Sequence, residues 1–456
     1  MRNAKQNMEI KNIQTRVSHS FRWISLESLA YQGLLLIHQI MLCKVAGYKL
    51  YGKIGALFSV VYLMVTIANF GLESSLSPFF KKITKNKRRF RSFFLIQSIP
   101  TIALSLFIGV VAIMLKSYNY KITSFIGYDL ICILFLLILS ECIKKTVRSI
   151  LHFSFRNKIN AYIETGYIIS YISVVWTYYM LTHTITLYAI FIPMLLMSFV
   201  SSVILGFFAF SFYRQIPDTT KKTDINFALP ALKCRFFNFL NQWSHSIFSG
   251  NFLVPFFAMQ FGLAHAGVFK LINHISYGIT SLLRKIFGWT SDITLSATKD
   301  LSIAAKRQIF EVITQRLYHF LYVIIIFLAI NLHKIVASSQ NGTSSINWPL
   351  ILFFLVITLS ENLLITYEKF YIAEEKNHYI LLFNLFTIGS FAAIISLSPY
   401  VSQLFLLLAI ASIRIVTFTL LSIISFYTWS IRPKLAVNPA YIAASLIISA
   451  LFFAIF

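Results

Sequence analysis

Long apolar runs separated by short polar connections fill this chain from residue 22 onward. Each of twelve successive runs has about 20–29 residues, enough to cross the ~30 Å hydrocarbon core of a bilayer as an α-helix. The runs are 22–44, 54–78, 92–115, 127–148, 160–181, 184–210, 231–259, 263–289, 309–333, 348–368, 378–398 and 401–429. Apolar positions are continuous within each run and do not alternate, which excludes the strands of a membrane barrel. The pattern predicts an all-α polytopic membrane protein with 12 core transmembrane helices.

Composition agrees with this class. Hydrophobic residues make up 57% of the 456 residues and charged residues 12%, whereas soluble domains carry about 25% charged residues. The net charge of +25 would suggest a nucleic-acid partner in a soluble chain. Here the basic residues cluster between apolar runs, so we expect contacts with anionic membrane lipids and no nucleic acid.

The basic connections predict the orientation in the membrane. Lysine and arginine concentrate in 79–91, 144–158, 214–235 and 284–307, whereas the alternate connections are short and poor in basic residues. Because cytoplasmic loops carry the excess of Lys and Arg, we expect these segments and the N-terminus to be cytoplasmic.

The two halves of the chain resemble each other. Each half opens with two long helices joined at a Gly-x4-Gly turn, Gly47 to Gly52 in the first and Gly262 to Gly267 in the second. Six spans in each half predict two six-helix lobes, related as a parallel pseudo-repeat, around a central cavity. The expected segments are a cytoplasmic tail (1–21), an N-terminal lobe (22–210), a cytoplasmic linker (211–230), a C-terminal lobe (231–429), and a basic connection with an extra apolar segment (430–456). That last segment is either a thirteenth span or half of a hairpin.

Three cations inside apolar runs are candidates for an anion-binding cavity: Lys270, Arg414 and Arg235. A charged side chain at the bilayer centre costs about 2.5–3.5 kcal/mol on insertion scales, so such residues normally face a bundle interior or a wet cavity. Lys270 has an alternative, which is snorkelling to the outer headgroups. Arg414 either lines the cavity or pairs with Glu361, and Arg235 lies near the cytoplasmic end, where it also fits a topological role.

Polar and acidic residues complete the candidate site. The polar cavity residues are expected to be Asn273, His274, Gln242 and His245. Two acids, Glu27 and Glu361, are candidates for binding a driving H+ or Na+, although Glu27 also fits a solvated position near its helix end.

No motif in the sequence indicates enzymatic activity or metal binding. The sequence contains no P-loop, Gly-x-Ser-x-Gly or His-Glu-x-x-His pattern. The four cysteines have unrelated spacings and no metal-ligand pattern. We therefore expect no enzyme, no cofactor and no metal site.

Two short segments carry a family resemblance. Tyr51-Gly52 leads through a long apolar run to Asn69-Phe70-Gly71-Leu72, and Ala266-Gly267-Val268-Phe269 stands at the matching place in the second half. These segments are similar to the "YG" turn, the "(D/N)-x-G-(L/I)" helix end and the "(V/A)-G-x-(Y/F)" signature of polysaccharide-biosynthesis (O-antigen type) flippases. That family belongs to the multidrug/oligosaccharidyl-lipid/polysaccharide (MOP) exporter superfamily.

The resemblance implies a flippase of the bacterial cytoplasmic (inner) membrane. It would move a polyprenyl-diphosphate-linked oligosaccharide by alternating access, alongside polysaccharide polymerase or export partners. Two alternatives stay open: a multidrug or small-cation exporter of the same superfamily, and a non-transporting accessory subunit of a polysaccharide export complex. A cation exporter is expected to carry more acid than base in its cavity.

Overall fold

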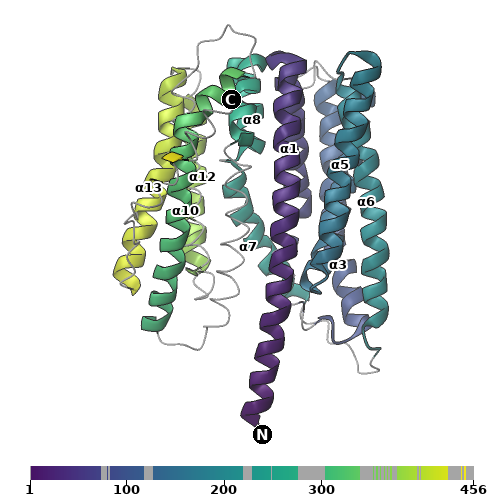
Figure 1. Cartoon of the computed structure of the whole chain (residues 1–456), viewed down its shortest axis with the longest axis vertical. Helices are drawn as coiled ribbons and strands as arrows, with labels where there is room; N and C mark the ends of the chain where they lie inside the picture. Colours follow the sequence, from purple (N-terminus) through teal and green to yellow (C-terminus); the bar gives the residue numbers. More distant parts are fainter. Residues whose placement is uncertain are drawn as a thin grey trace. The chain divides into compact units, whose positions relative to one another are not determined.

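The structure is a computed structural model, and the residues that it describes are almost all helical. They are 2–72, 83–117, 127–218, 228–247, 249–275, 303–338, 377–397 and 402–429, with single positions at 80, 400 and within 353–371 and 443–447. The helices (Figure 1) are α1 (Arg2–Asn69), α3 (Lys87–Ser117), α4 (Tyr128–Phe153), α5 (Asn157–Thr182), α6 (Leu187–Gln215), α7 (Ala228–Ile247), α8 (Gly250–Phe261), α10 (Ile303–Ser338), α12 (Asn377–Leu397) and α13 (Gln403–Trp429). A further helical run covers 263–275. The part of the chain so described contains no strand, which confirms the predicted all-α class.

Six of the described helices are long and apolar enough to cross a membrane. They lie within α1, α3, α6, α10, α12 and α13. Helices α4 and α5 coincide with two further predicted spans but carry charged side chains inside them. The expected C-terminal segment and most of the predicted span 348–368 lie outside the described residues.

Both predicted glycine turns have the same backbone conformation. Gly47 interrupts α1 with φ 69° and ψ 161°, and Gly262 ends α8 with φ 87° and ψ 168°. A positive φ with an extended ψ is open almost only to glycine. The shared geometry supports the internal repeat that the sequence predicted.

One predicted span differs from the structure. The run 231–259 was expected as a single helix, but α7 ends at Ile247 and α8 starts at Gly250. Ser249 caps α8, because its hydroxyl accepts from the Asn251 backbone N–H at 3.2 Å and donates to the Ser246 carbonyl at 2.7 Å. A local serine bond of this kind competes with helix continuation.

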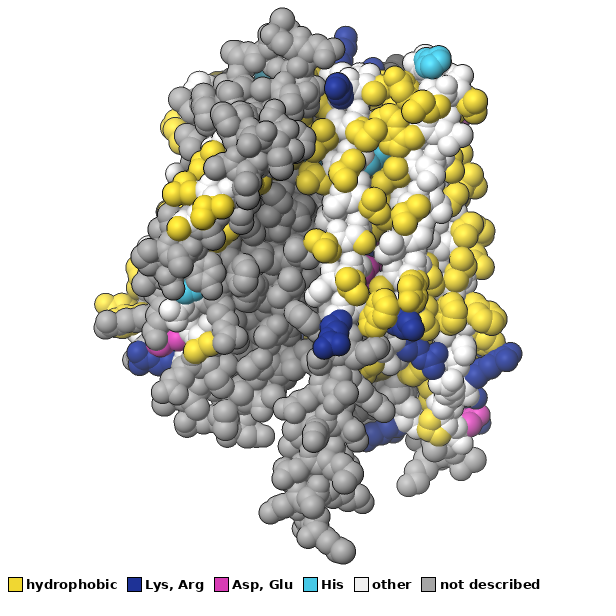
Figure 2. Space-filling model, viewed as in Figure 1, with side chains coloured by type: hydrophobic (Ala, Val, Ile, Leu, Met, Phe, Trp, Pro, Cys, Tyr) yellow, Lys and Arg dark blue, Asp and Glu magenta, His cyan; other side chains and the backbone are white. Residues whose placement is uncertain are grey.

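The residues group into two compact units, 1–38 with 52–266 and 39–51 with 267–456. In the first unit α4 packs along α6, and serines join the two helices: the Ser140 hydroxyl donates to that of Ser198 at 3.0 Å, and the Ser202 hydroxyl donates to the Ser140 carbonyl at 3.2 Å. The opposite face of α6 exposes large apolar side chains such as Phe199 and Phe207. Figure 2 shows such apolar side chains over the first-unit helices, with Lys and Arg toward their ends. This is the arrangement of helices that face lipid on one side and each other on the other.

The end of α1 approaches α7 closely within the first unit. Phe70 and Gly71 both have positive φ, 47° and 71°. A Cβ on Gly71 would lie 2.6 Å from the backbone oxygen of Arg235 and 2.8 Å from the backbone nitrogen of Phe239. The glycine of the Asn69-Phe70-Gly71 motif is therefore required by both backbone angle and space.

We predict that Gly71→Ala destabilises the protein by about 1–3 kcal/mol, because α7 must move away or the backbone must strain. Gly166→Ala in the middle of α5 is the matched control, since a Cβ there meets nothing within 4 Å. Thermal unfolding of both variants in detergent measures the difference. Equal melting temperatures would contradict the close approach.

Candidate functional site

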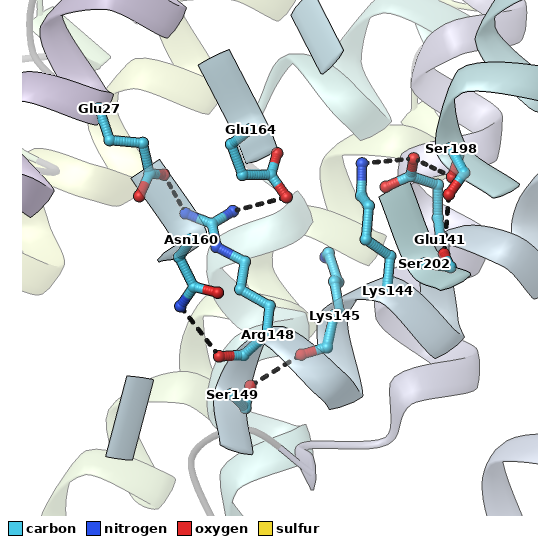
Figure 3. Close-up of polar contacts among 10 residues, drawn as sticks. All are labelled: Glu27, Glu141, Lys144, Lys145, Arg148, Ser149, Asn160, Glu164, Ser198 and Ser202. Atoms are coloured by element: carbon cyan, nitrogen blue, oxygen red, sulfur yellow. Dashed lines mark hydrogen bonds and ion pairs between the residues drawn. The ribbon is translucent and has the colours of Figure 1, made fainter. Parts of the chain in front are cut away.

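A cluster of buried charges forms the most elaborate polar site of the first unit (Figure 3). Its centre is α4, where Glu141, Lys144 and Arg148 follow one another at spacings of three and four residues. That spacing puts all three on one face of the helix. The cluster therefore uses a single helix face to present two bases and an acid to its neighbours.

Lys144 and Glu141 form one half of the cluster. The ammonium lies 2.8 Å from the Glu141 carboxylate, and both side chains are buried. The Ser198 hydroxyl of α6 donates to the same carboxylate at 2.7 Å. The Lys144 ammonium also lies 4.0 Å from the centre of the Tyr167 ring of α5. Each charge is thus compensated by an opposite charge and by a further polar or aromatic group.

Arg148 forms the other half and bridges two helices. One guanidinium nitrogen pairs with Glu27 of α1, and the other lies 3.9 Å from Glu164 of α5. Arg148 is 34% exposed, whereas the two carboxylates are almost fully buried. Asn160 donates to the Arg148 carbonyl at 3.2 Å and holds this turn against α5.

The ion pairs of the cluster bring three carboxylates, those of Glu27, Glu141 and Glu164, close to the bases Lys144 and Arg148. Lys145, a half-buried base on the same turn of α4, lies beside them (Figure 3). No group of three or more His, Cys, Asp or Glu side chains suited to hold a metal ion occurs among the described residues.

Arg235 is fully buried, and all three of its guanidinium nitrogens donate hydrogen bonds. Its Nε donates to the Phe70 carbonyl at 2.8 Å, and Nη2 donates to the Asn69 carbonyl at 2.8 Å and to the Thr101 hydroxyl at 2.6 Å. Nη1 donates to the carbonyl and the side-chain oxygen of Gln97. All five guanidinium donors are used, and the carbonyls at the end of α1 supply partial negative charge. In this structure Arg235 fastens α7 to α1 and α3, and its predicted role in substrate binding stays a prediction.

Lys270 and Arg414 are both buried in the second unit, with 4% and 1% exposure. Burial of Lys270 in the helical run 263–275 differs from the exposed position that snorkelling requires. Asn273 and His274, one turn further on, are half-buried.

Arg414 of α13 lines a small cavity with Asn384 and Thr417. This cavity has room for about one water molecule. The cavity is too small for a sugar diphosphate.

The structure describes some of the remaining predicted site residues and not others. Gln242 of α7 is half-buried. Glu361 and the side chain of His245 lie outside the described part of the structure, so the expected Arg414–Glu361 pair stays a prediction. Glu27 is buried and paired, not solvated.

Sequence reasoning missed the partners of Glu27. Lys144 and Arg148 belong to the segment 144–158 that was expected as a cytoplasmic connection, but α4 continues to Phe153. The missed signal is the helical spacing of Glu141, Lys144 and Arg148. A loop whose basic residues only set the membrane orientation needs no such spacing.

Comparison with solved structures identifies the fold. A multidrug resistance MATE family transporter of the MOP superfamily, solved facing inward, superposes with a TM-score of 0.56 over 88% of this chain and 94% of its own, at 13% identity. A Vibrio cholerae MATE transporter matches over 90% and 95% (TM-score 0.56, 10% identity), and so does a Pyrococcus furiosus MOP superfamily transporter (TM-score 0.56, 12% identity). The chain has the MATE transporter fold. No known family model and no curated protein sequence matches it.

Because the MATE-like fold covers about nine-tenths of the chain, the predicted multi-span helical architecture is confirmed. At such low identity the comparison concerns the fold alone. The substrate has to be argued from the side chains.

We predict that Lys144→Met costs about 3–5 kcal/mol of stability, because it leaves the buried Glu141 carboxylate without its cation. The double variant Lys144→Met/Glu141→Gln removes both charges, and we expect it to recover at least half of that loss. Unfolding of the two variants in the same detergent measures the coupling. Additive effects of the two substitutions would contradict the pairing.

Proposed function

We propose that this protein is an ion-coupled membrane transporter of an amphiphile with an anionic head, best exemplified by a polyprenyl-diphosphate-linked oligosaccharide. The observation that carries the proposal is the burial of two cations, Lys270 and Arg414, in the second unit. Lysine and arginine form strong charge-assisted hydrogen bonds with phosphate groups, so two such side chains inside this unit suit a substrate with an anionic head.

The fold supports a transport role by analogy, since its solved neighbours are transporters. A sugar diphosphate cannot cross hydrocarbon unaided, because its polar groups would lose their hydration without replacement. Alternating access would let the head cross inside the protein while the isoprenoid tail stays in lipid. We further propose the cytoplasmic membrane and a cytoplasmic N-terminus, as the basic connections predict.

The ion cluster supports coupling to a gradient. Glu27 belongs to a site with three carboxylates, and such a site changes its charge when it takes up a proton or a cation. Because Arg148 joins Glu27 of α1 to Glu164 of α5, a change in the charge of the cluster changes how these helices hold together. This gives a route from ion binding to a conformational change.

A second candidate function is the export of drugs or small organic cations. It is favoured by the multidrug transporter among the structural neighbours and by the carboxylates of the first unit. The Pyrococcus furiosus neighbour is described as having a binding pocket of reverse polarity that suggests a different function. The fold therefore accommodates pockets of either sign, and the buried cations of this chain favour an anion.

We predict that Lys270→Ala and Arg414→Ala each slow flipping of a fluorescent polyprenyl diphosphate sugar by roughly 30-fold, since loss of a buried charge contact costs about 2 kcal/mol or more. The measurement is quenching of the labelled lipid by external dithionite in proteoliposomes. Lys233→Ala removes an exposed lysine and serves as the control.

Two results would count against the substrate assignment. Unchanged flipping in both variants at equal reconstitution would remove the anionic site. Efflux of ethidium by the wild-type protein without flipping of the diphosphate probe would favour the drug-exporter function.

We also predict that Glu27→Gln abolishes the stimulation of flipping by an imposed ion gradient, because the cluster loses the carboxylate that pairs with Arg148. Flipping without a gradient should change less than twofold. The same proteoliposomes, tested under a pH gradient and then under a sodium gradient, provide the comparison. Full stimulation in Glu27→Gln would place coupling elsewhere.

A further inference from the structure

A column of polar aromatic side chains leads away from the ion cluster inside the first unit. On α1, Tyr31 and His38 follow Glu27 on the same helix face, and on α5, Tyr167 and Tyr171 follow Glu164. Spacings of three, four and seven residues keep side chains on one stripe of a helix. From Glu27 to His38 the column rises about 16 Å, roughly half the thickness of the hydrocarbon core.

The lower part of the column touches the charges. Tyr31 interacts electrostatically with Lys144 and Glu164, and its side chain is hydrogen-bonded to Tyr62. Tyr167 lies against the Lys144 ammonium. Three hydroxyl-bearing rings therefore stand directly above the carboxylates.

The upper part ends at a buried histidine. His38 is 1% exposed, and its ring centre lies 5.3 Å from that of Tyr171. The indole N–H of Trp176 donates to His38 Nδ1 at 3.1 Å. Because an indole nitrogen only donates, Nδ1 is the acceptor, and neutral His38 carries its hydrogen on Nε2.

Two polar atoms at this level have no partner in the described structure. They are His38 Nε2 and the Tyr171 hydroxyl, both buried. Buried polar groups are normally hydrogen-bonded, so a neighbouring pair of exceptions points to a function or to bound water. An apolar packing role would be served as well by phenylalanine.

We propose that this column is a proton pathway that delivers the coupling proton to the Glu27–Arg148–Glu164 site. His38 is its entrance, and Trp176 blocks that entrance while its N–H donates to His38 Nδ1. The inference rests on the proposed ion coupling through Glu27, and it selects the proton over sodium. A pathway of hydroxyl and imidazole groups relays protons and offers no carboxylate ligands to a metal ion above the cluster.

The transfer moves one proton, which enters at His38 and is bound by a carboxylate of the cluster. With Trp176 turned away, His38 Nδ1 accepts a proton and Nε2 releases one toward Tyr171. The hydroxyls of the column exchange donor and acceptor roles, and a carboxylate of the cluster receives the proton. While Trp176 donates to Nδ1, as in this structure, entry is closed.

The described groups in contact with His38 are uncharged. Helix α5 presents Tyr171 and Trp176, and the part of α1 after Gly47 contributes Tyr62 one level below. The charged groups described here lie at the other end of the column, where Lys144 and Arg148 of α4 meet the three glutamates. A change of pH therefore acts on the column through His38 and on the cluster through its carboxylates.

The test follows protonated carboxyl groups by time-resolved infrared difference spectroscopy of the full-length protein in proteoliposomes after an acid step. Glu27→Gln should remove part of the carboxyl band and so assign it to the cluster. His38→Gln and Tyr171→Phe should slow the appearance of the band on the order of tenfold, the effect of losing one hydrogen-bonded relay group. Its final size should not change.

Two further variants complete the design. Tyr178→Phe removes a hydroxyl from an exposed position of the same helix and should match the wild type. Trp176→Phe keeps the ring but removes the N–H, so protonation should become faster. Because Tyr171→Phe is conservative, it keeps the test decisive even where His38→Gln fails to fold.

The outcomes separate the pathway from transport. Wild-type protonation rates in Tyr171→Phe and His38→Gln would overturn the pathway. Diphosphate flipping driven by a sodium gradient alone would also overturn the pathway, but it would agree with the proposed transport of the diphosphate. Slowed protonation in a protein that does not flip the diphosphate probe would support the pathway and reject the transport substrate.

Discussion

The cost of removing charge from water organises the described part of this protein. A buried ion left without a partner costs several kcal/mol, so each one dictates which helices meet around it. Arg235 needs five acceptors, and it obtains them where α1 ends and α3 passes, which brings α7 to that place. Arg148 needs carboxylates, and its pairs with Glu27 and Glu164 hold α1, α4 and α5 together. Apolar packing alone would leave the order of these lipid-facing helices far less determined.

The two units use buried charge differently. In the first unit three glutamates pair with Lys144 and Arg148, and we propose that the charge of this site changes when it binds a proton. In the second unit the buried cations Lys270 and Arg414 are the residues that we propose bind the anionic head of the substrate. We infer a division between an ion-responsive first unit and a substrate-binding second unit.

Much of the fold follows from the sequence, because a bilayer permits few structures. Continuous apolar runs of about 20 residues have to form helices, and the glycines at 47 and 262 mark turns that other residues cannot make. The break at Ser249 could not be read from apolarity, since the cap depends on a local hydrogen bond inside an otherwise apolar run. The cluster was only half predicted: Glu27 was recognised, but Lys144 and Arg148 look the same in sequence whether they end a helix in water or turn inward. For Arg148 the choice depends on Glu27, which lies far away along the chain, and on Glu164, which follows only after the turn to α5.

The charge of the ligand that the protein binds tests this account most directly. Equilibrium binding of a polyprenyl diphosphate and of a lipophilic cation, tetraphenylphosphonium, should be compared on the full-length protein in nanodiscs of uncharged lipid. The account predicts that the diphosphate binds, that added salt weakens its binding, and that the organic cation neither binds tightly nor competes. Tight binding of the cation with no binding of the diphosphate would contradict it.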